Sequence, residues 1–215
     1  MIILLMGVSG SGKTTVGELL AADLGWAFWD GDQLHPPANI AKMSAGIPLT
    51  DADRAPWLAA IRASIDRRLA RKENGVVACS ALREQYRHLL VSDPAQVKVV
   101  CLWGDFGLIA QRMLRRKGHF MKENLLKSQF EALELPANAL LVNVALSPAE
   151  IVGKILRALG LKRRHHPPAG AKASPARRRR GRKAVKSGQH KKPKRPAKAP
   201  KPRRAPPSPR RRRGK

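Results

Sequence analysis

The stretch GVSGSGKTT, residues 7–15, constrains the fold of this chain more than any other feature. It fits the pattern G-x-x-x-x-G-K-[S/T] in full, follows a short apolar run and precedes an amphipathic helical pattern. Glycines at these positions let backbone N–H groups turn inward around phosphate oxygens, and the start of the next helix adds its positive end. The sequence therefore predicts a strand, a phosphate-binding loop and a helix in succession.

The same loop predicts which groups hold a nucleotide. The Lys13 ammonium is expected to reach the β- and γ-phosphates, and the Thr14 hydroxyl is expected to ligate Mg²⁺. The nucleotide-binding residues expected from the loop are Gly7, Val8, Ser9, Gly10, Ser11, Gly12, Lys13, Thr14 and Thr15.

Short apolar runs alternate with amphipathic helical patterns along the first 160 residues. The apolar runs predict strands at Ile2–Met6, Trp26–Trp29, Gly75–Cys79, Val97–Trp103 and Leu140–Val144. The helical patterns predict helices at Lys13–Leu24, Asp51–Lys72 (with Thr50 as N-cap), Ala81–Val91, Phe106–Arg116 and Pro148–Leu159. Such an order predicts an α/β fold, a five-stranded parallel sheet covered by helices on both faces. Ligands of these sheets bind outside the carboxyl ends of the strands.

The charge distribution divides the chain into two regions. Residues 162–215 hold 24 of the 43 Lys and Arg residues, 10 of the 17 prolines and none of the 15 acidic residues. The first 161 residues therefore carry a net charge of +4, against +28 for the whole chain. We predict a folded domain at 1–161 and a disordered basic tail at 162–215, because the second region has too few apolar residues to form a core.

Three interpretations of the basic tail (residues 162–215) remain open. Its clustered arginines predict sequence-independent, salt-sensitive affinity for nucleic acid or another polyanion. It has no aromatic residue to stack on bases, so base-specific recognition is not expected. The other two interpretations are a solvated extension of little consequence and the product of a reading-frame slip in a GC-rich gene. The abundant lysines argue against the slip.

The rest of the composition indicates a reduced, soluble protein. Only two cysteines occur, Cys79 and Cys101, each inside an apolar run, and no Cys/His cluster suggests a zinc site or a disulfide framework. The apolar start MIILLMGV is too short for a signal peptide, and no apolar run approaches the roughly 20 residues of a membrane span. We therefore expect a cytoplasmic protein with no membrane partner.

Two carboxylates follow the second predicted strand in the stretch WDGDQLHPP. No later predicted strand ends in the aspartate that assists Mg²⁺ in many phosphate-loop proteins, and no N-K-x-D motif of the GTPase type occurs. Asp30 and Asp32 are therefore the nearest acidic groups for holding Mg²⁺ and for accepting a proton from a substrate hydroxyl. Asp30 is our candidate metal ligand beside Thr14, both aspartates are catalytic candidates, and which of the two is the base stays open. The structural alternative is a turn that these aspartates cap.

Four stretches of the chain, in this order, resemble bacterial gluconokinases: MGVSGSGKTT, DGDQLHPPANIAKMSAGIPLTDADRAPWL, CSALREQYRHLL and RRKGHFMKENLLKSQFEALELP. The resemblance covers about residues 2–160. It implies the fold of the nucleoside monophosphate and shikimate kinases, a five-stranded parallel sheet with a small lid, and a homodimer. It also implies ATP- and Mg²⁺-dependent phosphorylation of D-gluconate at its 6-hydroxyl, by direct in-line transfer.

Gluconate has one carboxylate and several hydroxyls, so its site needs a cation and several hydrogen-bonding groups. Arg54 is the expected carboxylate anchor, because a guanidinium grips a carboxylate through two bonds. Arg83 and Ser80 are expected at the same rim, with Asp32 and His35 as partners for the hydroxyls.

The cation-rich stretch RMLRRKGHFMK, residues 112–122, resembles the lid of this family. From the resemblance we expect Arg112 to bind the nucleotide and Arg116 to stabilise the transferring phosphoryl group. One position departs from the family: Asn143 stands in the last predicted strand, where an acidic residue would be expected. Any role of that position is therefore in doubt.

Two alternative functions stay open. The first is a related small-molecule kinase that acts on shikimate or a nucleoside, although the stretches HPPANIAKM and KGHF match the gluconate family in particular. The second is a nucleic-acid-tethered phosphate-loop protein in which the basic tail is the main functional element. Deletion of the tail discriminates, because a kinase would keep its turnover.

Overall fold

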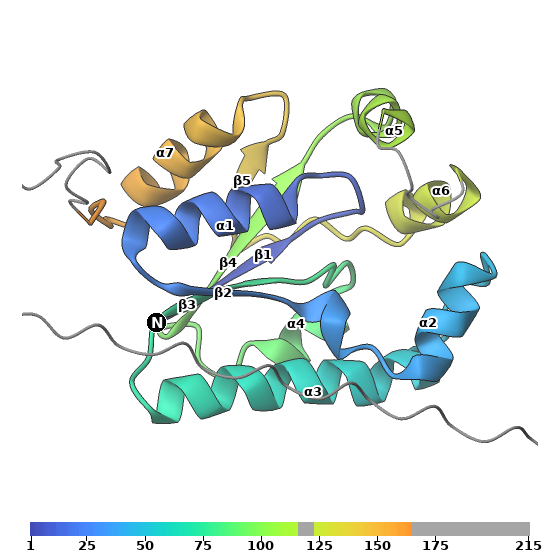
Figure 1. Cartoon of the computed structure of the whole chain (residues 1–215), viewed down its shortest axis with the longest axis horizontal. Helices are drawn as coiled ribbons and strands as arrows, with labels where there is room; N and C mark the ends of the chain where they lie inside the picture. The colour runs from blue at the N-terminus through green and yellow to red at the C-terminus, as the bar shows by residue number, and fades with distance from the viewer. Residues whose placement is uncertain (116–122, 165–215) are drawn as a thin grey trace, which may run out of the picture. The chain divides into compact units, whose positions relative to one another are not determined.

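The computed structural model describes residues 1–115 and 123–164 of the chain (Figure 1). Five parallel strands form one sheet in the order β2-β3-β1-β4-β5. The strands are β1 (Ile2–Met6), β2 (Ala27–Asp30), β3 (Gly75–Ala78), β4 (Val97–Trp103) and β5 (Leu140–Asn143). The five-stranded parallel sheet predicted from the sequence is confirmed, and each predicted strand lies within one residue of its observed bounds.

Helices cover both faces of the sheet. Helices α1 (Lys13–Leu24) and α7 (Pro148–Ala158) lie together on one face, and α3 (Asp51–Ala70) and α4 (Glu84–Leu90) lie on the other (Figure 1). Three further helices stand beyond the carboxyl ends of the strands: α2 (Pro37–Ser44), α5 (Phe106–Leu114) and α6 (Glu123–Glu131). A short 3-10 helix, η1 (Gly31–Leu34), joins β2 to α2.

Strand β1 is the central strand of the sheet and is buried on both faces. All five of its side chains are buried, and they alternate between two cores. Ile3 and Leu5 contribute to the core beneath α1 and α7, whereas Leu4 and Met6 contribute to the core beneath α3. This alternation is what a central strand covered on both faces requires. The loop that follows β1 is therefore held at the middle of the carboxyl edge.

Four of the five predicted helices are shorter in the structure, and two of these differences coincide with a positive φ. The helix predicted at Ala81–Val91 begins only at Glu84, because Ala81 has a φ of 41° and Arg83 is extended. Residues 80–83 form a loop at the carboxyl end of β3 instead. The helix predicted at Asp51–Lys72 ends at Ala70, and Lys72 has a φ of 57°. Its predicted start is confirmed, because the Thr50 side chain accepts a hydrogen bond from Asp53 N within a capping box.

The folded unit continues slightly past the boundary expected at residue 161. Arg163 Nε lies 2.9 Å from Asp23 Oδ2, and the Arg164 backbone N–H donates to Asp23 O at 2.7 Å. The first compact unit of the chain spans Met1–Ala169, of which the structure describes residues 1–115 and 123–164. Residues 165–215, which include most of the basic tail, lie outside the described part. Within the described ranges, no helix is long and apolar enough to cross a membrane.

Candidate active site

The phosphate-binding loop runs from the end of β1 to the start of α1, as predicted. Gly7 has a φ of 142°, and a Cβ there would lie 2.4 Å from Leu102 O, so only glycine fits. Gly12, at the start of α1, has a left-handed φ of 92°. The Lys13 Nζ donates to Gly7 O at 2.9 Å and to Val8 O at 3.0 Å. The lysine therefore crosses its own loop, in the position from which it can meet a bound phosphate.

Asp30, the last residue of β2, faces the end of this loop. The Thr14 hydroxyl donates to Asp30 Oδ2 at 3.0 Å, and the Asp32 backbone N–H donates to Asp30 Oδ1 at 3.0 Å. A hydroxyl and a carboxylate side by side form a donor set that suits Mg²⁺, which keeps few protein ligands and relies on phosphates and waters for the rest. No group of three acidic, His or Cys side chains within residues 1–115 and 123–164 could hold a metal alone. The residues therefore fit a metal that arrives with the nucleotide.

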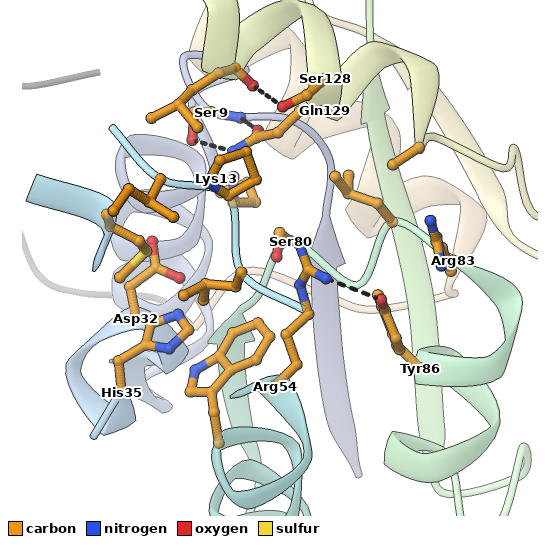
Figure 2. A pocket seen from close by; sticks show the side chains of 18 residues that line it. Ser9, Lys13, Asp32, His35, Arg54, Ser80, Arg83, Tyr86, Ser128 and Gln129 are labelled. Atoms are coloured by element: carbon orange, nitrogen blue, oxygen red, sulfur yellow. Dashed lines mark hydrogen bonds between the residues drawn. The ribbon is translucent and has the colours of Figure 1, made fainter. Parts of the chain in front are cut away.

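Asp32, two residues further on, faces a different space. Its carboxylate lines a pocket of about 160 Å³ that also contains Lys13 and His35 (Figure 2). Asp32 is exposed to solvent, but protein atoms surround its carboxylate closely enough to remove part of its hydration. This loss of hydration raises the pKa of Asp32, Lys13 opposes the shift, and the nearby Asp30 adds to it. The two aspartates thus separate, one toward the loop hydroxyl and one toward the pocket.

The pocket collects residues from four separate parts of the chain. Figure 2 shows Asp32 and His35 on one side, Arg54 and Tyr86 on the other, and Ser9, Ser128 and Gln129 along a third. Ser80 lies between them, and its carbonyl accepts a hydrogen bond from Gly7 N at 3.3 Å. The lining residues are Ser9, Lys13, Asp32, His35, Met43, Ile47, Pro48, Leu49, Arg54, Trp57, Ser80, Leu82, Arg83, Tyr86, Leu125, Ser128, Gln129 and Ala132.

His35 is held in place by stacking. Its ring lies parallel to Trp57 with centroids 4.2 Å apart, and Trp57 Nε1 donates to Gly31 O at 2.8 Å. Burial lowers the pKa of His35, Asp32 opposes this shift, and Arg54 adds to it. A neutral imidazole at the pocket wall can donate or accept one hydrogen bond with a hydroxyl group.

A cluster around Asp51 fixes the two predicted arginines. Asp51 Oδ1 lies 3.3 Å from Arg54 Nη1, and Asp51 Oδ2 lies 3.3 Å from Arg83 Nη1. Gln85 Nε2 donates to Asp51 Oδ2 at 3.1 Å, and the Tyr86 hydroxyl donates to Asp51 Oδ1. The Tyr86 hydrogen bond is the main cause that lowers the pKa of Asp51, with Gln85 and the two arginines adding to it. Asp51 was not predicted as a site residue, yet it brings both guanidinium groups to one rim.

Helix α2 contributes Met43 to the lining of the same pocket. It is attached to the start of α3, because Lys42 Nζ lies 2.7 Å from Asp53 Oδ1 and Asn39 Nδ2 donates to Asp53 O at 2.8 Å. The bond from Lys42, together with those from Thr50, lowers the pKa of Asp53 to about 2. The HPPANIAKM stretch therefore closes the side of the pocket opposite Tyr86.

Helix α6 was not predicted, and it contributes Leu125, Ser128 and Gln129 to the pocket. Gln129 Oε1 accepts from Ser9 N at 2.7 Å, and Gln129 Nε2 donates to Ser9 Oγ at 3.3 Å. The helix has an apolar face, with Leu126 1% exposed, so its periodicity could have shown the element. No sequence pattern indicates that its glutamine reaches the phosphate loop.

A second hollow of about 320 Å³ lies on the other side of the phosphate loop. It is lined by Gly10, Ser11, Gly12, Thr15, Val16, Arg112, Arg115, Leu146, Pro148 and Ile151. Arg112, one of the predicted nucleotide-binding residues, is fixed there by a hydrogen bond from Nη2 to Val144 O at 2.7 Å. The predicted catalytic residue Arg116 lies outside the described residues. Asn143 Oδ1 accepts from Ala145 N at 2.7 Å, so this residue shapes the turn after β5 that borders the hollow.

Several known proteins are similar in sequence to this chain. A family model described as shikimate kinase matches residues 9–159. The thermosensitive gluconokinase of Escherichia coli strain K12 is 52% identical over 133 residues, which cover 62% of this chain and 71% of that protein. A probable gluconokinase of Mus musculus is 43% identical over 178 residues, which cover 74% of this chain and 97% of that protein.

Solved structures show the same likeness. A gluconokinase from Sinorhizobium meliloti is 51% identical with a TM-score of 0.66, over 74% of this chain and 90% of that one. An unliganded sugar kinase from a Janibacter species is 38% identical with a TM-score of 0.70, over 74% of this chain and 94% of that one.

Proposed function

Because the chain belongs to the gluconokinase family of phosphate-loop kinases, we propose that it transfers the γ-phosphoryl group of ATP to the 6-hydroxyl of D-gluconate. One observation carries the proposal: a single pocket contains the phosphate-loop lysine, a carboxylate and two arginines. Lys13 would contact the phosphates of ATP, and Asp32 would interact with the attacking hydroxyl. The two arginines would pair with the anionic end of the acceptor. This combination suits a small polyol acid.

The carboxylates of Asp30 and Asp32 have different roles in this proposal. Asp30, which accepts a hydrogen bond from Thr14, would hold Mg²⁺ together with that hydroxyl, and the metal would neutralise charge on the phosphates of ATP. Asp32 accepts the proton of the acceptor hydroxyl, because it faces the acceptor pocket and its raised pKa makes it a better base. Of the two aspartates, we therefore propose Asp32 as the catalytic base.

The transfer is direct. The 6-hydroxyl oxygen forms a bond to the γ-phosphorus while the bond from that phosphorus to the β–γ bridging oxygen breaks, and ADP leaves with the bonding electrons. The hydroxyl proton passes to Asp32. Lys13 stabilises the charge that develops on the phosphoryl oxygens, and Arg116 is proposed to add to it. ATP extends from this pocket past the loop to the hollow at Arg112.

The test is ATP consumption by the full-length chain with Mg²⁺ and a panel of acceptors: gluconate, shikimate, glycerate and nucleosides. Turnover with gluconate, with phosphorus NMR placing the phosphate on carbon 6, supports the proposal. Faster turnover with any other acceptor would overturn it.

Arg54→Ala is expected to raise the KM for gluconate by roughly tenfold to a hundredfold, because hydrogen bonds to charged groups contribute about 1.5–3 kcal/mol. The KM for ATP should stay unchanged, since Arg54 contacts the acceptor side of the pocket. Steady-state kinetics with each substrate varied in turn measures both. Arg67→Ala, on an exposed position of the same helix, is the matched control. An equal rise in both KM values would contradict the assignment.

For the basic tail we infer a second role, the binding of polyanions such as nucleic acid. The observation that favours it is the charge of residues 162–215, with 24 cations and no acidic residue. The full-length chain should bind duplex DNA with an affinity that falls steeply with salt, since each neutralised phosphate contributes about −0.9 to the slope of log K against log salt. Electrophoretic mobility shifts at several salt concentrations test this, with a chain that ends at Arg164 as control. Equal DNA binding by both chains would overturn it.

The homodimer stays a prediction, for light scattering to test.

A further inference from the structure

The side chain of Gln129, on helix α6, contacts the phosphate loop. The Gln129 carboxamide makes two hydrogen bonds with Ser9, one from the backbone N–H at 2.7 Å and one to the hydroxyl at 3.3 Å (Figure 2). The two residues are 120 positions apart in the sequence, so this contact is tertiary. In a loop of this kind, the backbone N–H groups are what a bound phosphate uses. Gln129 therefore engages a group that belongs to the nucleotide site.

The position of Ser9 indicates which phosphate is concerned. Ser9 lines the acceptor pocket together with Lys13 and Asp32. Gly10 and Gly12 line the hollow on the opposite side of the loop, next to Arg112. The phosphoryl group nearest to Ser9 is thus the one that faces the acceptor, which is the γ-phosphoryl.

We propose that Gln129 is a positioning residue that occupies the γ-phosphate's place at Ser9 and is displaced when ATP binds. The proposal rests on the proposed kinase function. The Ser9 N–H makes one short hydrogen bond at a time, and a charged phosphate oxygen is a stronger acceptor than a carboxamide oxygen. ATP therefore displaces the glutamine, whereas ADP, which has no γ-phosphate, leaves it in place.

Displacement at Ser9 also changes the acceptor pocket, because α6 lines it with Leu125 and Ser128. Once displaced from Ser9, Gln129 remains in the lining of the pocket, where a carboxamide can hydrogen-bond to the hydroxyls of a polyol. ATP binding thus prepares the pocket for the acceptor. Coupling between binding sites is reciprocal, so the acceptor must raise the affinity for ATP by the same factor.

The test compares two nucleotides on the full-length chain by isothermal calorimetry with Mg²⁺. The probes are ADP and AMP-PNP, an ATP analogue with nitrogen in place of the β–γ bridging oxygen. Gln129→Ala should bind AMP-PNP about 3- to 10-fold more tightly than the wild type, the range of one hydrogen bond, and should bind ADP with unchanged affinity. In the wild type, gluconate should tighten AMP-PNP binding about fivefold or more, and in the variant less than twofold. Lys127→Ala, on an exposed position of α6, should behave as wild type.

A second substitution keeps the test decisive if Gln129→Ala fails to fold. Gln129→Glu retains the acceptor for Ser9 and adds a negative charge, so it should weaken AMP-PNP binding about tenfold or more and ADP binding less. Equal effects on both nucleotides, or no effect of either substitution on AMP-PNP, would overturn the proposal. The contrast between ADP and AMP-PNP requires no turnover. A chain that shows this contrast but phosphorylates no gluconate would refute the proposed substrate and leave the role of Gln129 standing.

Discussion

Replacement of Lys13 by alanine is expected to lower kcat by on the order of a hundredfold to a thousandfold, the usual effect of losing one group that stabilises transition-state charge. The ammonium lies across the phosphate loop, 2.9 Å from Gly7 O, and lines the pocket in which Asp32 lies. It can therefore stay close to the γ-phosphoryl group while negative charge moves from the acceptor oxygen to the leaving oxygen. Steady-state kinetics with gluconate and ATP measures the effect.

The stability of the Lys13→Ala variant should change little, because the lysine is half-buried and lies outside the two hydrophobic cores. Thermal unfolding checks this. Lys154→Ala, an exposed position on α7, is the matched control and should retain full turnover. Turnover by Lys13→Ala within a few-fold of the wild type would refute the role given to the lysine.

The sequence was sufficient to predict the sheet and the phosphate loop because both depend on local patterns. The apolar run of β1 and the glycines that follow it allow few other structures, and the structure confirms them. Helix boundaries were less predictable where an unusual backbone conformation interrupts a helical sequence pattern. Ala81 takes a positive φ that alanine seldom adopts, so the helix predicted to begin there begins three residues later.

Contacts between distant segments could not be predicted in this way. Arg54 and Arg83 were chosen because each is a cation near the carboxyl edge of the sheet, but the group that unites them, Asp51, looked like an ordinary first-turn acid of α3. Gln129 lies in a stretch that resembles the family, but no sequence pattern indicated its contact with Ser9, which forms because α6 returns to the phosphate loop. Local sequence patterns thus predict the nucleotide-binding loop better than the side-chain contacts of the acceptor pocket.

Asp32→Asn is expected to lower kcat by about a hundredfold to ten-thousandfold, the range attributed to a general base. An asparagine keeps the shape of the aspartate but cannot take the proton of the acceptor hydroxyl. Asp30→Asn should behave differently. Asp30 accepts a hydrogen bond from Thr14 on the metal side, so its loss should raise the Mg²⁺ concentration needed for half-maximal rate. Kinetics at varied Mg²⁺ separates the two variants.

The pH dependence of the wild type supplies a further check on Asp32. A base works only in its ionised form, so kcat/KM must fall as the pH drops through its pKa. Burial raises the pKa of Asp32 above the ordinary value of 3.8, so this acid limb should lie above that of a solvent-exposed aspartate. In Asp32→Asn the limb should disappear from the residual activity, whereas in Asp30→Asn at saturating Mg²⁺ it should persist. If Asp30→Asn instead removes the limb and Asp32→Asn retains it, the two aspartates exchange roles. In that case, the base would be the carboxylate bonded to Thr14.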